Sequence, residues 1–288
     1  MTTTARPTGN ARIPFQISEQ MCAHFDPLLG AMWLRWNPQP RPCFNPPLLD
    51  ACRAYGEFLQ NSGGVIEHEG KSYPIKSSIL ASDVPGVFNL GGDLSLFTKL
   101  IDTRDRSGLM TYGTACVDAV YNNYMGYGLP ISTISLVQGE CLGGGFEAAL
   151  SSNLVIAERS ARFGFPEIIF NLFPGMGAVS FVIRRTNSRV ADTLTSTGTI
   201  YSAEEMLEMG IIDKVVNDGE GVAAVEEYLR AKEPLMRSIF QVRRRVQPKL
   251  IRRELDDIVG FWVNATLQIN PRDLRLMGLL VARQDKLH

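Results

Sequence analysis

Residues 131–178, ISTISLVQGECLGGGFEAALSSNLVIAERSARFGFPEIIFNLFPGMGA, carry the pattern that decides the fold. The run 131–137 is short, apolar and β-branched, and it is bounded by a proline and a glycine, which predicts a strand. Gly143 to Gly145 follow this strand and precede the helix-forming run at 146–150. Glycine in a turn lets a ligand approach the main chain, and the first N–H groups of a helix are unpaired. We therefore expect this turn to hold a developing negative charge.

Two glutamates in the same stretch have apolar neighbours. Glu147 lies just inside the expected helix, and Glu167 follows two phenylalanines and a proline. Carboxylates are seldom placed in such surroundings for solubility, so both are candidates for acid–base chemistry. A glycine turn is also a common packing device, and that structural interpretation stays open. The stretch matches neither the dinucleotide-binding glycine pattern nor the phosphate-binding loop.

Composition and charge exclude several classes of protein. The 288 residues include 45% hydrophobic and 20% charged residues, and the net charge is -1. This balance gives no overall attraction to nucleic acid or to an anionic membrane. The start, MTTTARPTGNARIPF, lacks a charged segment followed by an apolar one, and no run reaches the ~18 apolar residues of a membrane span. We expect a cytoplasmic protein with no nucleic-acid partner and no membrane insertion.

The cysteines indicate reduced thiols. There are five, far apart and without a C-x-x-C or histidine pairing: Cys22, Cys43, Cys52, Cys116 and Cys141. An odd number with this spacing argues against a disulfide framework and against a metal site. Cys141 lies near the glycines, but none of the three histidines stands in a recognisable motif, so a thiol nucleophile is not favoured. No cofactor is expected.

The chain in order predicts an α/β fold. Residues 1–18 are expected to form a flexible arm, residues 19–216 a core of alternating strands and helices, and residues 217–288 a helical region. Further strands are expected near 32–36 and 76–81, and helices over 106–124 and, between Pro234 and Leu287, in segments broken at Pro248 and Pro271. Strands that alternate with helices imply a mostly parallel sheet, where ligands sit beyond the carboxyl ends of the strands.

A second glycine pair repeats the layout of the first. Gly91 and Gly92 also follow a strand and precede a helical run. If the N–H groups of Gly92 and Gly144 converge on one point, they make an oxyanion hole suited to a thioester carbonyl. Two carboxyl groups beside it could then remove the C2 proton of a 3-hydroxyacyl thioester and protonate the departing hydroxyl. Which glutamate takes which role stays open.

Four motifs resemble the crotonase, or enoyl-CoA hydratase/isomerase, superfamily: NLGGDL at 89–94, QGECLGGGFEAAL at 138–150, FGFPEIIFNLFPGMGA at 163–178 and YSAEEMLEMGIIDKVV at 201–216. The two glutamates stand twenty residues apart, as in the hydratase pattern. The resemblance implies a crotonase-like spiral of ββα units with a helical C-terminal trimerisation region. Carried over by position, Glu147 and Glu167 are the catalytic pair, and Gly92 and Gly144 are the oxyanion donors.

A finer resemblance extends over nearly the full length. VFNLGGDLSLF at 87–97, FWVNATLQ at 261–268 and LRLMGLLVARQ at 274–284 are similar to bacterial diffusible signal factor synthases. This resemblance implies a dehydratase (lyase) that forms the cis-2-enoyl thioester on acyl carrier protein, and a thioesterase that releases a cis-2-unsaturated fatty acid for quorum sensing. It also implies a homotrimer or dimer of trimers, and sequestration by the receiver domain of a sensor kinase. Two alternatives stay open: an enoyl-CoA hydratase, and a non-catalytic regulatory binder of a sensor kinase.

The chain departs from ordinary hydratases near its start. CFNPPLL replaces the usual N-x-L motif, and VIEHEGKSYPI is an additional segment after the first long helix. These departures put the usual coenzyme A cradle in doubt and fit a carrier-protein donor.

Two further groups of residues are candidates for substrate contacts. Leu142, Met176, Trp262 and Leu280 are candidates for an acyl pocket, although a packed helix pair or a trimer contact explains the helical ones equally well. Arg243, Arg244, Arg245 and Lys249 belong to a basic island that extends to Arg252 and Arg253, and they are candidates for docking an acidic carrier protein. A solvated helix face is the ordinary interpretation of such a charge run.

Overall fold

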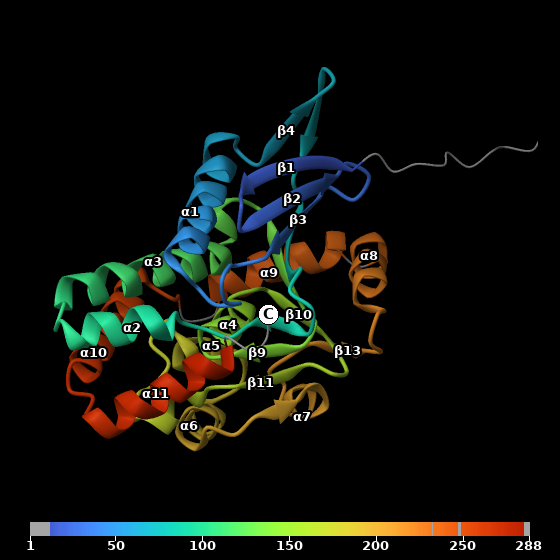
Figure 1. The fold of residues 1–288 in the computed structure, drawn as a ribbon. Helices are drawn as coiled ribbons and strands as arrows, with labels where there is room; N and C mark the ends of the chain where they lie inside the picture. The colour runs from blue at the N-terminus through green and yellow to red at the C-terminus, as the bar shows by residue number, and fades with distance from the viewer. Residues whose placement is uncertain (1–11, 232, 247–248, 285–288) are drawn as a thin grey trace, which may run out of the picture.

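A large twisted sheet runs through the molecule (Figure 1). The computed structural model describes residues 12–231, 233–246 and 249–284. Within these residues the sheet has seven strands in the order β1-β2-β3-β6-β8-β10-β13. The strands are β1 Ile13–Ser18, β2 Met21–Asp26, β3 Ala31–Trp36, β6 Ser77–Ser82, β8 Ser132–Val137, β10 Leu154–Glu158 and β13 Lys214–Val216. The first three pair antiparallel, and β3 to β13 pair parallel.

A smaller sheet lies beside the large one. In the described chain it has the order β12-β11-β9-β7, formed by β7 Val87–Asn89, β9 Glu140–Leu142, β11 Arg162–Gly164 and β12 Tyr201–Ser202. A separate hairpin of β4 Val65–His68 and β5 Lys71–Pro74 extends from the end of α1, Pro46–Asn61.

The chain alternates between the two sheets. β6 is followed by β7 and then by α2, Leu94–Asp102, and α3, Arg106–Tyr124. β8 is followed by β9 and α4, Gly144–Leu150, and β10 by β11, the 3₁₀ helix η2 at Pro166–Phe170, and helices α5 Ala178–Arg185 and α6 Ser188–Thr197. The short helix α7, Ala203–Glu208, then leads to β13. This repeat confirms the predicted α/β spiral of ββα units.

The predicted flexible arm is wrong for its last part. Ile13–Ser18 form β1, which pairs antiparallel with β2 at the edge of the large sheet. Ile13, Phe15 and Ile17 alternate with more polar positions and pack on the core, so the strand has the usual period of two. Pro14 obscured this pattern, because proline is tolerated only where a strand has a free edge. Residues 1–11 lie outside the described residues.

Buried side chains fill both faces of the large sheet. All six residues of β8 are buried, which explains its continuous apolar and small-residue composition. One face packs on α1, α3 and α4, and the other packs on α8, Gly221–Ala231, and α9, Glu233–Val246. In the part of the chain that the structure describes, no helix is both long enough and apolar enough to cross a lipid bilayer.

The last two helices cover one end of the core. α10, Arg252–Thr266, packs on α3, and α11, Pro271–Gln284, packs on α2 and η2 (Figure 1). Pro271 begins α11, as the sequence predicts, whereas Pro248 lies outside the described residues. Trimerisation through this helical region stays a prediction.

Candidate active site

The pairing of the small sheet brings together three segments that are far apart in the sequence. β7 and β9 run parallel with Asn89 opposite Cys141, and β9 and β11 run parallel with Leu142 opposite Gly164. The chain therefore leaves all three strands at the same edge. Because of this, residues 90–92, 143–144 and 165–167 lie side by side, as expected for the carboxyl ends of parallel strands.

Glycine is required where the first two segments touch. Gly91 has a φ of 94°, and a Cβ atom added there would lie 2.9 Å from the backbone nitrogen of Gly144. Gly143 has a φ of 51°, and a Cβ atom added there would lie 2.6 Å from Oε1 of Glu167. Both residues have a left-handed backbone and crowded surroundings. Glycine at these positions therefore allows the chain to turn and also allows the neighbouring segments to approach closely.

The N–H groups of Gly92 and Gly144 are both available to a ligand. The carbonyl of Gly91 accepts a 2.7 Å hydrogen bond from the N–H of Phe44. In a trans peptide the C=O and N–H point in opposite directions, so the Gly92 N–H points away from Phe44. Gly144 begins α4, where an N–H has no intrahelical acceptor. Neither N–H donates a hydrogen bond to another group among the described residues.

Glu147 is a buried carboxyl group that is held by the backbone. It belongs to the first turn of α4 and is 1% exposed. Its Oε1 accepts hydrogen bonds from the N–H groups of Met176, at 2.8 Å, and Ala178, at 2.9 Å. Burial raises the pKa of Glu147 to about 7, and the backbone hydrogen bonds oppose this shift because they favour the ionised form.

Glu167 is the second carboxyl group, on η2. Its Oε2 is buried and has no hydrogen-bond partner among the described residues. The pKa of Glu167 is raised to about 8, first by burial and then by the charge of Glu147. Near neutral pH the pair therefore holds about one proton, which is the condition for one acid and one base.

One pocket brings together the residues predicted to be functional. Glu147, Glu167, Gly92 and Gly144 line it, as do the four acyl-pocket candidates Leu142, Met176, Trp262 and Leu280. Sequence reasoning missed other members of the wall, among them Phe97, Tyr112, Ile169, Leu172 and Ile200. Tyr112 and Cys116 are one turn apart on α3, and the apolar face of this helix was the available signal. The roles of the predicted residues stay predictions at this point.

The C-terminal helices close the apolar end of this pocket. The Trp262 ring of α10 lies 5.1 Å from that of Phe97, centroid to centroid. Gly175 is required beneath it, because a Cβ atom added there would lie 2.5 Å from Cγ of Trp262. Leu280 adds an apolar side chain from α11. This wall comes from residues more than eighty positions after Glu147 and Glu167 in the chain.

Burial disfavours the ionised form of the thiols nearest the site: Cys116 lines the pocket, and burial raises the pKa of its thiol. All five cysteines are free. Cys141 is buried outside the pocket lining, and burial raises its thiol pKa. In the described part of the chain no cluster of three histidine, cysteine or acidic side chains could hold a metal ion.

The basic island is divided by the fold. Arg243 is exposed on α9, with its guanidinium 6.0 Å from the centre of the Phe240 ring, and Lys249 is exposed. Neither lines the pocket of the two glutamates. Arg252 forms ion pairs with Asp118 and with Asp256, so its charge is compensated. The side chains of Arg244 and Arg245 lie outside what the structure describes.

Comparison with known proteins defines the class. Residues 58–254 match the sequence profile of the enoyl-CoA hydratase/isomerase family. Human methylglutaconyl-CoA hydratase is 29% identical over 218 residues, which are 74% of this chain and 62% of that protein. The peroxisomal bifunctional enzyme of Cavia porcellus is 30% identical over 172 residues, which are 60% of this chain and 22% of that protein. The chain thus spans less than two thirds of the length of these two curated relatives.

Solved structures share the fold. An enoyl-CoA hydratase/isomerase from Xanthobacter autotrophicus Py2 superposes with a TM-score of 0.72 at 20% identity, covering 93% of this chain and 94% of that one. The fold and the family profile together define a member of the crotonase superfamily. The chain belongs to the enoyl-CoA hydratase/isomerase family.

Proposed function

We propose that this chain interconverts 3-hydroxyacyl and 2-enoyl thioesters, using Glu147 and Glu167 as the acid–base pair. A single observation carries the proposal: the buried carboxyl group of Glu147, the half-buried Glu167 with its buried Oε2, and two backbone N–H groups without a partner among the described residues line one largely apolar pocket. The N–H groups of Gly92 and Gly144 would bind the thioester oxygen.

The chemistry follows from the positions of charge. With the carbonyl oxygen bound by the two N–H groups, the negative charge formed when C2 loses its proton moves to that oxygen. In dehydration, ionised Glu167 takes the C2 proton while protonated Glu147 gives its proton to the C3 hydroxyl, which leaves as water. Hydration is the reverse, with ionised Glu147 activating water and protonated Glu167 protonating C2. The N–H groups of Met176 and Ala178 support the ionised form of Glu147 in that direction.

The finer proposal is a diffusible signal factor synthase. After dehydration, a water molecule would attack the thioester carbonyl. The tetrahedral oxyanion would accept hydrogen bonds from the same two N–H groups. Collapse of the intermediate expels the thiol and leaves a free cis-2-unsaturated acid, so one water and one thioester give one acid and one thiol. The motif resemblance supports this step, and the apolar wall of Trp262, Phe97 and Leu280 is suited to an acyl chain.

The donor in this proposal is an acyl carrier protein. The additional segment of the sequence is the β4–β5 hairpin, and none of its residues lines the pocket. Arg243 and Lys249 are exposed charges that could attract an acidic partner through salt-sensitive association. Assembly into trimers and binding of a sensor-kinase receiver domain belong to the same proposal.

One experiment separates the candidate functions. The purified chain is given 3-hydroxyacyl thioesters of carrier protein and of coenzyme A, and free acids and enoyl thioesters are measured by mass spectrometry. The signal synthase releases cis-2-enoic acid. A plain hydratase instead hydrates crotonyl-CoA with little acid release, and a regulatory binder does neither.

A matched control removes a different buried carboxyl group. Glu158 is 6% exposed, accepts hydrogen bonds from Gln138 and from the N–H of Gly221, and does not line the pocket. Glu158→Gln should keep product formation, whereas Glu167→Gln should abolish most of it. Equal amounts of product from wild type and Glu167→Gln would exclude this pocket as the catalytic site.

A further inference from the structure

The loop that carries Gly92 is held by Pro42 and Phe44, which do not line the pocket. The N–H of Leu90 donates to the carbonyl of Pro42 at 2.8 Å, and the N–H of Phe44 donates to the carbonyl of Gly91 at 2.7 Å. A segment from another part of the chain thus fixes the peptide group that bears the Gly92 N–H. The direction of this donor depends on where Phe44 is held.

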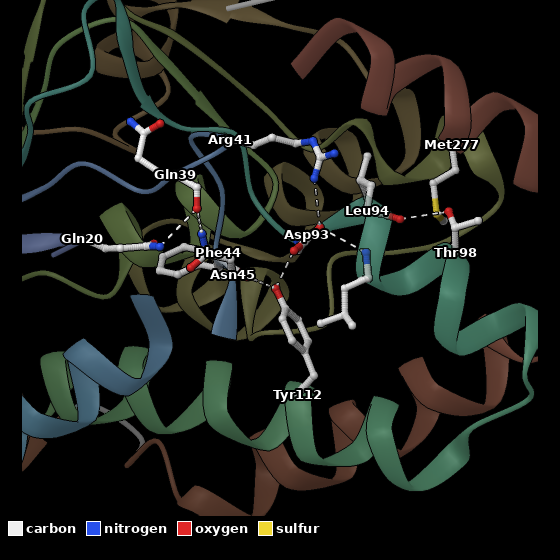
Figure 2. A network of polar contacts seen from close by, with 11 residues as sticks. Gln20, Gln39, Arg41, Phe44, Asn45, Asp93, Leu94, Thr98, Tyr112 and Met277 are labelled. Atoms are coloured by element: carbon white, nitrogen blue, oxygen red, sulfur yellow. Dashed lines mark hydrogen bonds and ion pairs between the residues drawn. The ribbon is translucent and has the colours of Figure 1, made fainter. Parts of the chain in front are cut away.

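The hydroxyl of Tyr112 joins the two sides of this arrangement (Figure 2). It donates a 2.6 Å hydrogen bond to the carbonyl of Phe44 and accepts a 3.2 Å hydrogen bond from the N–H of Asp93. Phe44 holds the peptide before Gly92, and Asp93 belongs to the peptide after it. One oxygen atom on α3 therefore ties the anchoring segment to the residue next to Gly92.

Tyr112 also packs in the pocket wall, where its hydroxyl interacts with the Cys116 thiol one turn along α3. It is 7% exposed, and its ring packs edge-on against Phe97, 4.9 Å between centroids at 87°. The Phe97 ring leaves no room for a side chain at position 92, because a Cβ atom added to Gly92 would lie 2.6 Å from the end of that ring. Burial raises the pKa of the Tyr112 phenol, so its hydroxyl stays protonated and can donate.

We propose that Tyr112 is a positioning residue for the oxyanion donor. By holding the Phe44 carbonyl and the Asp93 N–H at a fixed separation, its hydroxyl directs the Gly92 N–H at the thioester oxygen. Tyr112 acts only through Gly92 and takes no proton in the reaction. The inference rests on the proposed function, because it assigns Gly92 to the thioester carbonyl.

The test compares two tyrosine hydroxyls. Tyr112→Phe keeps the ring and removes the hydrogen bonds of the hydroxyl to Phe44 and Asp93, while the backbone hydrogen bonds from Leu90 to Pro42 and from Phe44 to Gly91 remain. Tyr55→Phe removes another buried hydroxyl, which lies 2.9 Å from Oγ of Ser78. Tyr55 is 1% exposed and does not line the catalytic pocket. Both variants are expected to fold, with comparable small losses in thermal midpoint.

Two measurements report on the oxyanion donor itself. Misdirecting one donor weakens an interaction that is strongest in the transition state, so Tyr112→Phe should lower kcat for hydration of a 2-enoyl thioester roughly 10-fold with little change in KM. Bound 2,4-hexadienoyl-CoA should also show a smaller red shift of its absorption in Tyr112→Phe, since that shift reports polarisation of the carbonyl. Tyr55→Phe should match wild type in both.

The outcomes distinguish this inference from the function on which it rests. An active wild type together with a Tyr112→Phe variant of unchanged kcat and unchanged red shift would overturn the positioning role alone. Equal losses in Tyr112→Phe and Tyr55→Phe would also overturn it, because the effect would then be general destabilisation. A wild type that neither turns over nor polarises any enoyl thioester would overturn the proposed function and this inference together.

Discussion

The backbone N–H of Ala178, at the start of α5, donates a 2.9 Å hydrogen bond to Oε1 of Glu147 in α4. The two residues are 31 positions apart, and the contact, together with the hydrogen bond from the N–H of Met176, fixes the direction of a buried carboxyl group. Gly177 makes it possible by adopting a φ of 115° immediately before the helix. The carboxyl group is thereby oriented before any substrate binds, which is how an acid–base group is held ready.

Glu147→Gln and Glu167→Gln should each lower dehydration by a factor of ~10² or more. General acid–base groups contribute on that scale, and an amide can neither take nor give the proton. Steady-state rates with a 3-hydroxyacyl thioester check this, with Glu158→Gln as the control. A variant that keeps most of its activity would exclude its glutamate from the mechanism.

The pH dependence of kcat/KM should be bell-shaped, with limbs governed by pKa values of about 7 and about 8. Both directions of the reaction use the form of the pair that holds one proton, so activity falls when the pair is fully protonated and when it is fully ionised. Rates measured from about pH 5 to about pH 10 test this expectation. A flat profile across that range would contradict it.

Glu167→Gln should stabilise the fold at alkaline pH. The folded-state pKa of Glu167 is raised, so its protonated form contributes stability that is fully present below the ordinary pKa and is lost as pH rises through about 8. The glutamine variant avoids that loss. Above pH 8 its free energy of unfolding should exceed that of wild type by up to about 5 kcal/mol, and the difference should disappear near pH 4. Urea titrations at the two pH values measure it, and a constant difference would contradict the pKa shift.

Gly91→Ala should lower kcat, whereas a control substitution at another left-handed glycine should not. Its added Cβ would lie 2.9 Å from the nitrogen of Gly144 and would separate the two oxyanion donors. Gly86→Ala is the matched control, since Gly86 also has a positive φ, 70°, but its Cβ would meet nothing within 4 Å. Gly86→Ala should lose about 1 kcal/mol of stability from the left-handed backbone. Gly91→Ala should lose more than that, because its Cβ also meets backbone atoms of Leu142 and Gly144. Only Gly91→Ala should lose a factor of roughly 10 or more in kcat, and equal kcat losses would argue against the convergence of the donors.

Leu280→Trp should shift the preferred acyl chain to shorter lengths. Leu280 lines the pocket from α11, and a larger ring there would occupy space at the apolar end. Leu279→Trp is the control on the same helix, because Leu279 is 68% exposed. Competition among thioesters of different chain length, followed by mass spectrometry, compares the variants. An unchanged chain-length profile in Leu280→Trp would place the acyl chain elsewhere.

The positions of the two glutamates and two glycines could be predicted because each sits in a local pattern. A strand, a glycine turn and a helix identify Gly144 and Glu147, and a strand followed by a proline identifies Glu167. Tyr112 could not be found in this way, because on α3 it is one apolar position among several. Its role depends on Phe44 and Asp93, which lie 68 and 19 residues away.

The docking of a carrier protein at Arg243, Arg244, Arg245 and Lys249 stays a prediction, but the basic island shows the same limit of a sequence. The sequence groups Arg252 with the other basic residues of the island, but in the fold it pairs with Asp118, 134 positions earlier. Charge runs are visible in a sequence, whereas the partners that neutralise them are not.

The sequence by itself determined the alternation of strands and helices, the enoyl-CoA hydratase/isomerase family and the candidate acid–base side chains, because these follow from local periodicity and short motifs. Only the tertiary structure decided that the loops after β7, β9 and β11 leave one sheet edge together, since parallel pairing joins strands from distant parts of the chain. The apolar wall from α10 and α11 and the burial that raises both glutamate pKa values likewise exist only in the folded chain. Burial is a property of what packs around a residue, and most of those neighbours are remote in the sequence.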